Sequence, residues 1–336
     1  MKNKISPDSS EFIAELEDVQ KRMREWGSCS QCIVFPIITD LHSGLVTEDP
    51  LNSQKRETAS HIRLLNRAAE MLHADFTANL GDTGLDVPLK TQGETETLMR
   101  RIAEFHAEST LPVLFTLGNH DDLNGKVPPQ RWNELFAKIN AKHKMTVGGD
   151  GSYGFYDVPG KNCRIFRINT NETDKISDDQ LEFLKKNLDS MPRERCAVIL
   201  QHFIAHPAGF WKRPANLPPH QLAPQHIKYN ELLHDFVKNG GTLAAVIAGD
   251  SHYDSYVKED GINRFTIQGY GGIAPHEKPE HARVSHEYNP LMGRSDSFDS
   301  SRTCLLELAV LDPGKRRLKL FRIGAGGNAC DREAVW

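Results

Sequence analysis

The sequence predicts an α/β fold in which helices cover the faces of the sheets. Short apolar runs typical of buried strands alternate with segments of helical periodicity, and this alternation is the pattern of α/β layers. The expected strands lie at 32–39, 74–80, 111–117, 164–169, 196–201 and 242–248. The expected helices lie between most of them, at 57–72, 94–108, 130–141, 178–188 and 226–239.

The two ends of the chain depart from this alternation. Apolar residues recur at helical spacing over 10–26, so we expect an N-terminal helix that packs against the domain. Near the C-terminus, strand-like runs at 264–268, 304–310 and 318–323 lack intervening helices, and DPGKRR at 312–317 is typical of a hairpin turn. We expect these last strands to add to a second sheet.

Length and composition limit the possible domain organisation and the classes of partner. The chain has 336 residues, 38% of them hydrophobic, which suffices for one large core. We expect a helical extension at 1–28 and a single domain at 29–336. The net charge of -4 argues against electrostatic binding to nucleic acid or acidic membranes. The N-terminal segment lacks the apolar core of a signal peptide and no run is long enough to span a membrane, which predicts a cytoplasmic location.

The six cysteines are too sparse for a disulfide scaffold. Cys29 and Cys32 form a lone C-x-x-C pair just before the first expected strand. Such a pair could be a redox centre or half of a zinc site. Because the sequence contains no second pair, the simplest interpretation is two ordinary reduced thiols.

Polar residues with metal-ligand chemistry follow five of the expected strands. They are Asp40, His42, Asp82, Asn119, His120, Asp121, His202, Asp250 and His252. The carboxyl ends of strands in an open α/β sheet share one edge, so loops distant in sequence meet there in one crevice. A single Asp or His after a strand is usually a turn residue or helix cap, but that explanation would have to hold five times. The pattern therefore predicts a site with enough ligands for two divalent metals.

In their order along the chain, these residues resemble the pattern of the calcineurin-like metallophosphoesterases. That pattern is D-x-H, G-D, G-N-H-D/E, H and G-H-x-H. Its elements here are Asp40-Leu41-His42, Gly81-Asp82, Gly118-Asn119-His120-Asp121, His202 and Gly249-Asp250-Ser251-His252. The resemblance extends over about residues 32–324 and implies a four-layer αββα sandwich of two mixed sheets flanked by helices, with metals at the carboxyl ends of strands.

The resemblance also implies a ligand set. One metal would be bound by Asp40, His42, Asp82 and His252, and the other by Asp82, Asn119, His202 and Asp250. Asp82 would then bridge the pair, a role that suits a carboxylate because its two oxygens can bind two ions.

Asp250 departs from the family pattern, which usually has histidine at this position. Aspartate makes the metal's shell richer in oxygen, and hard oxygen ligands favour manganese, magnesium or iron(II) over zinc. We therefore expect two divalent ions, with manganese or iron favoured and zinc or magnesium as alternatives. A competing interpretation is a decayed site that holds one metal or none, but the other ligand positions all match the family.

By the same resemblance, His120 faces the substrate and could protonate the leaving oxygen. Asp121 could fix the tautomer of His120 by hydrogen bonding, or it could merely cap the next turn. His206 lies four residues beyond His202 and is a rival for its ligand role. His202 directly ends its strand, as the other ligands do, and is therefore preferred.

Two polar insertions, at about 204–226 and 273–301, follow strands of the site and should lie over it. In the first, Trp211, Lys212 and Arg213 combine stacking surface with positive charge, as a nucleotide or aromatic ester would require. The alternative is a solvated loop with one aromatic residue packed on the core.

The expected function is hydrolysis of a phosphodiester or phosphomonoester of a small organic or nucleotidic substrate by metal-bound hydroxide. A phosphodiesterase is favoured over a phosphomonoesterase. One alternative is a nuclease, against which the acidic balance counts. Another is a non-catalytic metal-binding scaffold of the same fold, because fold alone does not decide function. The sequence leaves the oligomeric state open.

Overall fold

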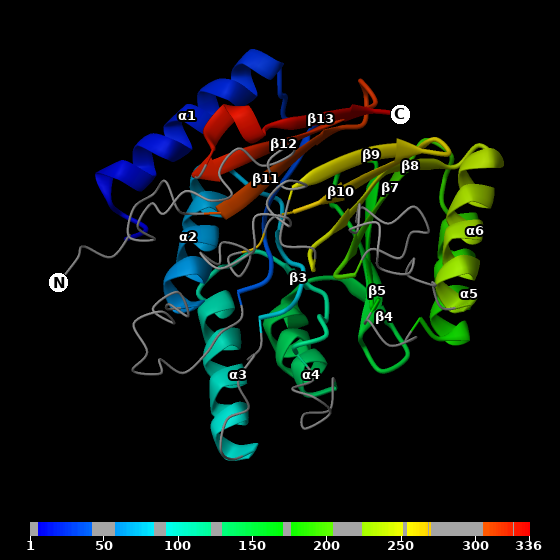
Figure 1. Ribbon diagram of the computed structural model, residues 1–336, viewed down its shortest axis with the longest axis horizontal. Coiled ribbons are helices and arrows are strands. Elements are labelled where there is room, and N and C mark those ends of the chain that lie inside the picture. The colour runs from blue at the N-terminus through cyan, green and yellow to red at the C-terminus, as the bar shows by residue number, and fades with distance from the viewer. Residues whose placement is uncertain are drawn as a thin grey trace, which may run out of the picture.

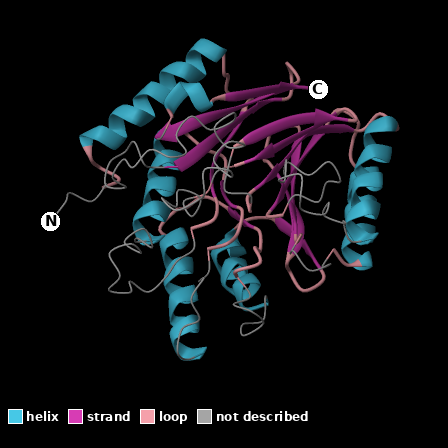
Figure 2. Cartoon of the chain, in the orientation of Figure 1, coloured by secondary structure: helices cyan, strands magenta, loops and turns pink. Residues whose placement is uncertain are grey.

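Two sheets lie face to face between two layers of helices in the computed structural model of the protein (Figures 1 and 2). This arrangement is the αββα sandwich of two mixed sheets that the family resemblance implied. The structure describes residues 6–41, 58–83, 92–121, 130–170, 176–203, 224–250, 254–267, 269, 305–324 and 326–336. None of the helices in this part of the chain has the length and apolarity needed to span a membrane.

The first sheet has six strands in the order β13-β12-β11-β1-β2-β3. They are β1 (Ile33–Ile38), β2 (Thr77–Asn79), β3 (Val113–Phe115), β11 (Leu305–Asp312), β12 (Arg317–Gly324) and β13 (Arg332–Val335). β1, β2 and β3 run parallel, whereas β11 pairs antiparallel with the opposite edge of β1. The three parallel strands therefore end at the same edge of the sheet.

The second sheet has seven strands in the order β4-β5-β6-β7-β8-β10-β9. They are β4 (Met145–Gly148), β5 (Tyr153–Asp157), β6 (Cys163–Ile168), β7 (Cys196–Gln201), β8 (Thr242–Ala248), β9 (Ser255–Glu259) and β10 (Ile262–Thr266). β6, β7, β8 and β10 are parallel, and antiparallel strands flank them on both sides.

Helices cover the outer face of each sheet (Figure 1). The helices among the described residues are α1 (Ser10–Trp26), α2 (Thr58–Met71), α3 (Gln92–Ala107), α4 (Gln130–Ile139), α5 (Asp178–Asp189) and α6 (Pro224–Lys238), with 3-10 turns η2 (Asn140–Lys142) and η5 (Gly327–Cys330). α1 to α4 pack on the first sheet, and α5 and α6 pack on the second. The six α-helices agree with the predicted positions to within two residues at each end.

Alternating side chains of β1 show how the layers are held together. Ile33, Phe35 and Ile37 point into the core between the sheets. Val34 and Ile38 point the other way, into the core beneath the helices. A strand buried on both faces is a continuous apolar run in sequence, which is why the run at 32–39 predicts this strand.

The C-terminal strands differ from the prediction. β11 and β12 were expected in a second sheet, but they extend the first sheet from the free edge of β1; only β10 joins the second sheet. The hairpin turn at 312–317 is confirmed, since Asp312 pairs with Arg317 across it. β4, β5, β9 and β13 were not predicted. These strands lie toward the sheet edges. β4 and β9 are half exposed, so these two strands lack the apolar pattern of a buried strand.

α1 is fixed to the first sheet by buried contacts. Ser9 caps its start by accepting a hydrogen bond from the backbone of Phe12, and Gly27, with φ of 79°, ends it in the left-handed conformation. Phe12, Leu16 and Val19 are fully buried in the core beneath the helices. α1 therefore belongs to the helical layer, as the expected packing against the domain requires.

A buried group of charged side chains joins the two sheets. Arg322 on β12 is fully buried and donates to Glu307 on β11 at 2.8 Å. It also contacts Asp254, which precedes β9 of the other sheet. Arg332 completes the group, with ion pairs of 3.0 Å to Asp254 and 2.9 Å to Glu307. Two positive and two negative groups thus compensate one another away from water.

Arg322→Met should lower the free energy of unfolding by about 3–5 kcal/mol, because Asp254 and Glu307 would keep buried charge with only Arg332 to compensate it. The matched control is Lys185→Met, which breaks the exposed Lys185–Asp189 pair and should cost less than about 1 kcal/mol. Urea unfolding of both variants measures the difference. Equal losses would contradict a structural role for the buried group.

Candidate metal centre

The residues that follow the parallel strands meet at one edge of the sandwich. Asp40 follows β1, Asp82 follows β2 and Asn119 follows β3 in the first sheet. His202 follows β7 and Asp250 follows β8 in the second sheet. Side chains of Asp40, Asp82 and His202 each place a ligand atom within 4.8 Å of the other two. Both sheets therefore contribute to a single cluster.

The ring of His202 is the centre of this cluster. Its Nε2 lies 3.2 Å from Asp82 Oδ2, 3.7 Å from Asp250 Oδ1 and 3.2 Å from Asn119 Oδ1. Its Nδ1 lies 2.7 Å from the carbonyl oxygen of Leu80. A carbonyl only accepts hydrogen bonds, so Nδ1 carries a proton and donates it, and in the neutral ring Nε2 keeps a lone pair. This is the tautomer and orientation that a metal-binding histidine requires.

Burial makes the charges of this cluster unfavourable unless opposite charge compensates them. Asp40 and His202 are fully buried and Asp82 is 1% exposed. Burial by itself lowers the pKa of His202, but the charges of Asp82, Asp40 and Asp250 outweigh it and raise that pKa well above its ordinary value. Three carboxylates around one imidazole are an environment that attracts positive charge. The oxygen and nitrogen donors fit a divalent cation.

The backbone at the three carboxylates is in the left-handed region. φ is 53° at Asp40, 50° at Asp82 and 62° at Asp250. This conformation is unfavourable for residues with a side chain, although Asp tolerates it better than most. The same strained turn therefore recurs directly after three strands. Strain of this kind persists where the surrounding structure imposes it, as it commonly does at functional sites.

Glycines allow the backbone to approach these carboxylates closely. A Cβ on Gly118 would lie 2.1 Å from Asp82 Oδ1, and one on Gly269 would lie 2.2 Å from Asp40 Cβ. A Cβ on Gly249 would lie 2.1 Å from Thr39 Oγ1, the hydroxyl that donates to Asp40 at 2.7 Å. No larger residue fits at these positions without displacing a carboxylate or the hydroxyl that donates to it.

Asp121 connects two of the loops that carry the cluster. Its fully buried carboxylate accepts backbone hydrogen bonds through Oδ2 from Asp82 at 3.0 Å and from Gly118 at 2.9 Å. Its carbonyl accepts from Trp132 Nε1 at 2.9 Å, which connects the loop to α4. Asp121 thus ties the loop after β2 to the loop after β3. Its proposed pairing with His120 remains a prediction.

His120 lies at the mouth of the cluster. Its backbone donates to Asp82 Oδ1 at 2.8 Å, and its Nε2 is 3.9 Å from Asp82 Oδ2. The ring is 41% exposed, in contrast to the buried ring of His202. This placement leaves the His120 ring accessible to a molecule that enters from solvent.

Several predicted residues lie outside the described part of the chain. They are His42, His252, His206, Trp211, Lys212 and Arg213. The described cluster therefore brings together five of the seven predicted ligands; their role as metal ligands stays a prediction, as do the assignments of the other residues.

A buried group of hydrogen bonds next to Asp82 was not predicted from the sequence. Asn79 accepts hydrogen bonds through Oδ1 from the backbone of Gly81 and the hydroxyl of Thr83, both at 3.0 Å. Its amide donates to Nε2 of the fully buried His106 at 3.2 Å. These contacts fix the turn that carries Asp82. An Asn two residues before the G-D motif was the available signal, but sequence alone could not reveal its partner on α3.

His106 should make folding stability depend on pH. Burial lowers its pKa from 6.5 to about 3, so the folded protein keeps the ring neutral while the unfolded chain takes up a proton below about pH 6.5. This contribution to stability is complete above that pH and falls progressively toward pH 3. At pH 5 the loss should be about 2 kcal/mol relative to neutral pH.

Urea unfolding from pH 7 to pH 4 tests this expectation against two variants. His106→Gln should flatten the acid dependence, whereas His73→Gln, at an exposed histidine, should keep it. An unchanged pH dependence in His106→Gln would contradict the assignment of the neutral ring.

Comparison with known families agrees with this geometry. The family model described as calcineurin-like phosphoesterase matches residues 34–254, from β1 to the residue before β9. The match covers well over half of the chain and includes every described residue of the cluster. The chain therefore belongs to the calcineurin-like phosphoesterase family.

Solved structures show the same fold at low sequence identity. The structure titled as GAP50, the anchor in the inner membrane complex of Plasmodium, has a TM-score of 0.51 at 10% identity and covers 91% of this chain and 89% of its own. The purple acid phosphatase PPD1 from yellow lupin seeds also has a TM-score of 0.51, at 13% identity. That match covers 92% of this chain but only 53% of the phosphatase. None of the curated proteins is significantly similar in sequence.

Proposed function

We propose that the protein is a dinuclear metal-dependent phosphoester hydrolase that acts on small organic or nucleotidic phosphoesters, with diesters favoured. The observation that carries the proposal is the His202 ring, whose Nδ1 is held by Leu80 while Nε2 faces the carboxylates of Asp82 and Asp250. A buried cluster of this kind at the carboxyl edge of an α/β sheet is where open α/β folds bind ligands.

The residues present fit a pair of divalent cations. Asp40 and Asp82 would hold one ion with His42 and His252, and Asp82, Asn119, His202 and Asp250 would hold the other. In phosphoester hydrolysis, two such ions neutralise charge on the phosphoryl oxygens and lower the pKa of water so that it can attack phosphorus. The oxygen-rich donor set supports manganese or iron over zinc.

Other residues of the protein would position the ligands, protonate the leaving oxygen and contact the substrate. Leu80 holds the His202 tautomer, and Asp121 and Asn79 hold the turn that carries Asp82. The exposed ring of His120 can donate a proton to the leaving oxygen, because it stands at the mouth and beside the Asp82 carboxylate. Trp211, Lys212 and Arg213 remain candidates for contact with the substrate.

A non-catalytic scaffold is the alternative with a specific observation behind it, since one protein of the same fold is described as an anchor. Fold does not determine function. The buried donor set and the accessible His120 support the enzyme, because a scaffold requires neither a strained carboxylate turn nor an exposed ring at the cluster. The proposed cytoplasmic location rests on the sequence alone.

Protein stripped of metal and reloaded with manganese or iron(II) should hydrolyse bis-p-nitrophenyl phosphate faster than p-nitrophenyl phosphate. Asp250→Ala should lose one bound ion and most of the turnover, whereas Asp250→His should keep both. Metal content by mass spectrometry and release of nitrophenolate measure the two effects. If the protein, fully loaded with metal, hydrolysed neither ester, the result would favour the non-catalytic scaffold.

His120→Ala should lower turnover by about 10²–10⁴, the usual contribution of general acid catalysis, and should leave metal content unchanged. His73→Ala is the matched control, because His73 is an exposed histidine two residues beyond the end of α2. Loss of metal from His120→Ala would instead make His120 part of the ligand shell.

A further inference from the structure

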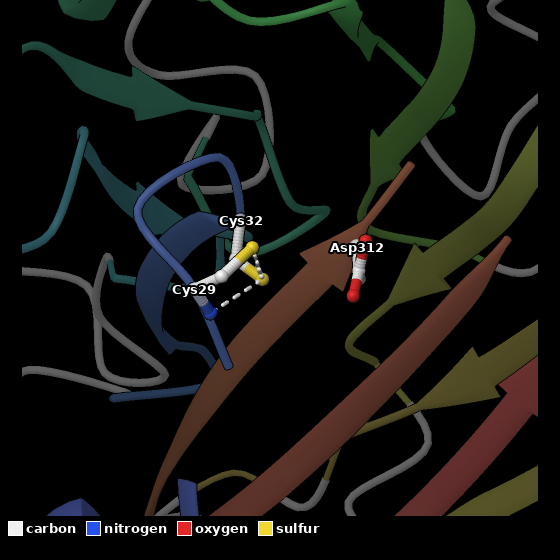
Figure 3. A group of neighbouring side chains, drawn as sticks. All are labelled: Cys29, Cys32 and Asp312. Carbon is white, nitrogen blue, oxygen red and sulfur yellow. Dashed lines mark hydrogen bonds between the residues drawn. The ribbon is translucent and has the colours of Figure 1, made fainter. Parts of the chain in front are cut away.

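The C-x-x-C pair forms a compact turn between α1 and β1. The backbone of Cys32 donates to the carbonyl of Cys29 at 3.0 Å, which closes the turn. The two Sγ atoms lie 3.5 Å apart and point toward one another (Figure 3). A disulfide requires about 2.05 Å between sulfurs, so a small rotation of the side chains would bring the atoms to bonding distance.

The two thiols differ in their access to solvent. Cys29 is exposed, whereas Cys32 is 1% exposed. Cys163 and Cys196 face each other across β6 and β7, but both are buried in the sandwich. A reagent from solvent can therefore reach the first pair through Cys29, and it cannot reach the second pair in the folded protein.

Electrostatics assigns the two thiols different roles. Hydrogen bonds from the Cys32 thiol and from the backbone of Gln31 lower the pKa of Cys29. Burial raises the pKa of Cys32 to about 11. The carboxylate of Asp312 lies close to both sulfurs and opposes a second negative charge. The arrangement favours a thiolate at Cys29 beside a protonated Cys32, and the thiolate is the nucleophilic form.

We propose that Cys29 and Cys32 form a reversible dithiol–disulfide site that exchanges with low-molecular-weight disulfides of the glutathione class. The Cys29 thiolate attacks one sulfur of the disulfide, forms a mixed disulfide and releases one thiolate of the reagent. Cys32 then loses its proton and attacks Cys29 Sγ, which forms the internal disulfide and releases the second thiolate. The protein loses two electrons and two protons, and one disulfide becomes two thiols.

The alternative is that the same atoms bind a metal ion. Among the described residues, only Cys29, Cys32 and Asp312 group here, whereas a structural zinc site requires four protein ligands. The Asp312 carboxylate is also engaged already, because it accepts from the backbone of Lys315 at 3.1 Å and lies 3.7 Å from Arg317 Nε. The donor set therefore favours exchange chemistry.

The pair is independent of the candidate metal centre. It precedes β1, whereas Asp40 follows the other end of that strand. At about 3.3 Å per residue, the two sites are separated by roughly 25 Å. A failure of this proposal would consequently leave the proposed phosphoesterase function untouched.

Trapping with N-ethylmaleimide tests the proposal on the native protein. In the reduced protein, Cys29 should react at least about tenfold faster than Cys32. After incubation with glutathione disulfide, the tryptic peptide 25–55 should contain an internal disulfide, while Cys163 and Cys196 should remain free thiols. Added reduced glutathione should reverse the bond.

Three variants separate the steps. Cys32→Ser should accumulate a stable glutathione adduct on Cys29, and Cys29→Ser should form none. Cys330→Ala, which removes a buried thiol elsewhere, should exchange like the unmodified protein. The proposal is overturned if no Cys29–Cys32 disulfide forms at any glutathione ratio, or if the purified protein holds a stoichiometric metal that protects both thiols from alkylation.

Discussion

The crowding of carboxylates around the Nε2 atom of His202 is the constraint on which the rest of the site depends. Asp40 and Asp82 are buried beside the His202 ring and Asp250 Oδ1 lies 3.7 Å from its Nε2, and such an arrangement is stable only with compensating positive charge. The left-handed turns aim the carboxylates inward, and glycines at the neighbouring positions leave room for them. The composition of these loops and their strain thus fit the divalent cations that we propose.

The two-sheet architecture makes this crowding possible. Each sheet ends its parallel strands at the same edge, so residues from β1, β2 and β3 face residues from β7 and β8. The bond from His202 to Leu80 crosses from one sheet to the other. At a distance from the cluster, the group built on Arg322 also connects the sheets. Packing between the sheets therefore sets the distance between the two halves of the donor set.

Much of this could be predicted from sequence, and the omissions have physical causes. Strands buried on both faces and amphipathic helices leave clear periodicities, and Asp or His residues after such strands indicated the cluster. Nothing local in the sequence reveals that Asp121 bonds to the backbone of Asp82 and Gly118, or that Asn79 meets His106. Those contacts join distant segments, and the same is true of the pairing of β11 with β1.

That pairing has a consequence for how the chain acquires its structure. Ile33 lies opposite Leu311 in the finished sheet, so one edge of β1 stays without its partner until nearly 280 further residues have left the ribosome. Pairings between such distant segments are slow to form, and an open apolar edge invites association with other chains. Biogenesis of this protein is therefore most vulnerable to aggregation during synthesis, before the last hairpin closes the first sheet.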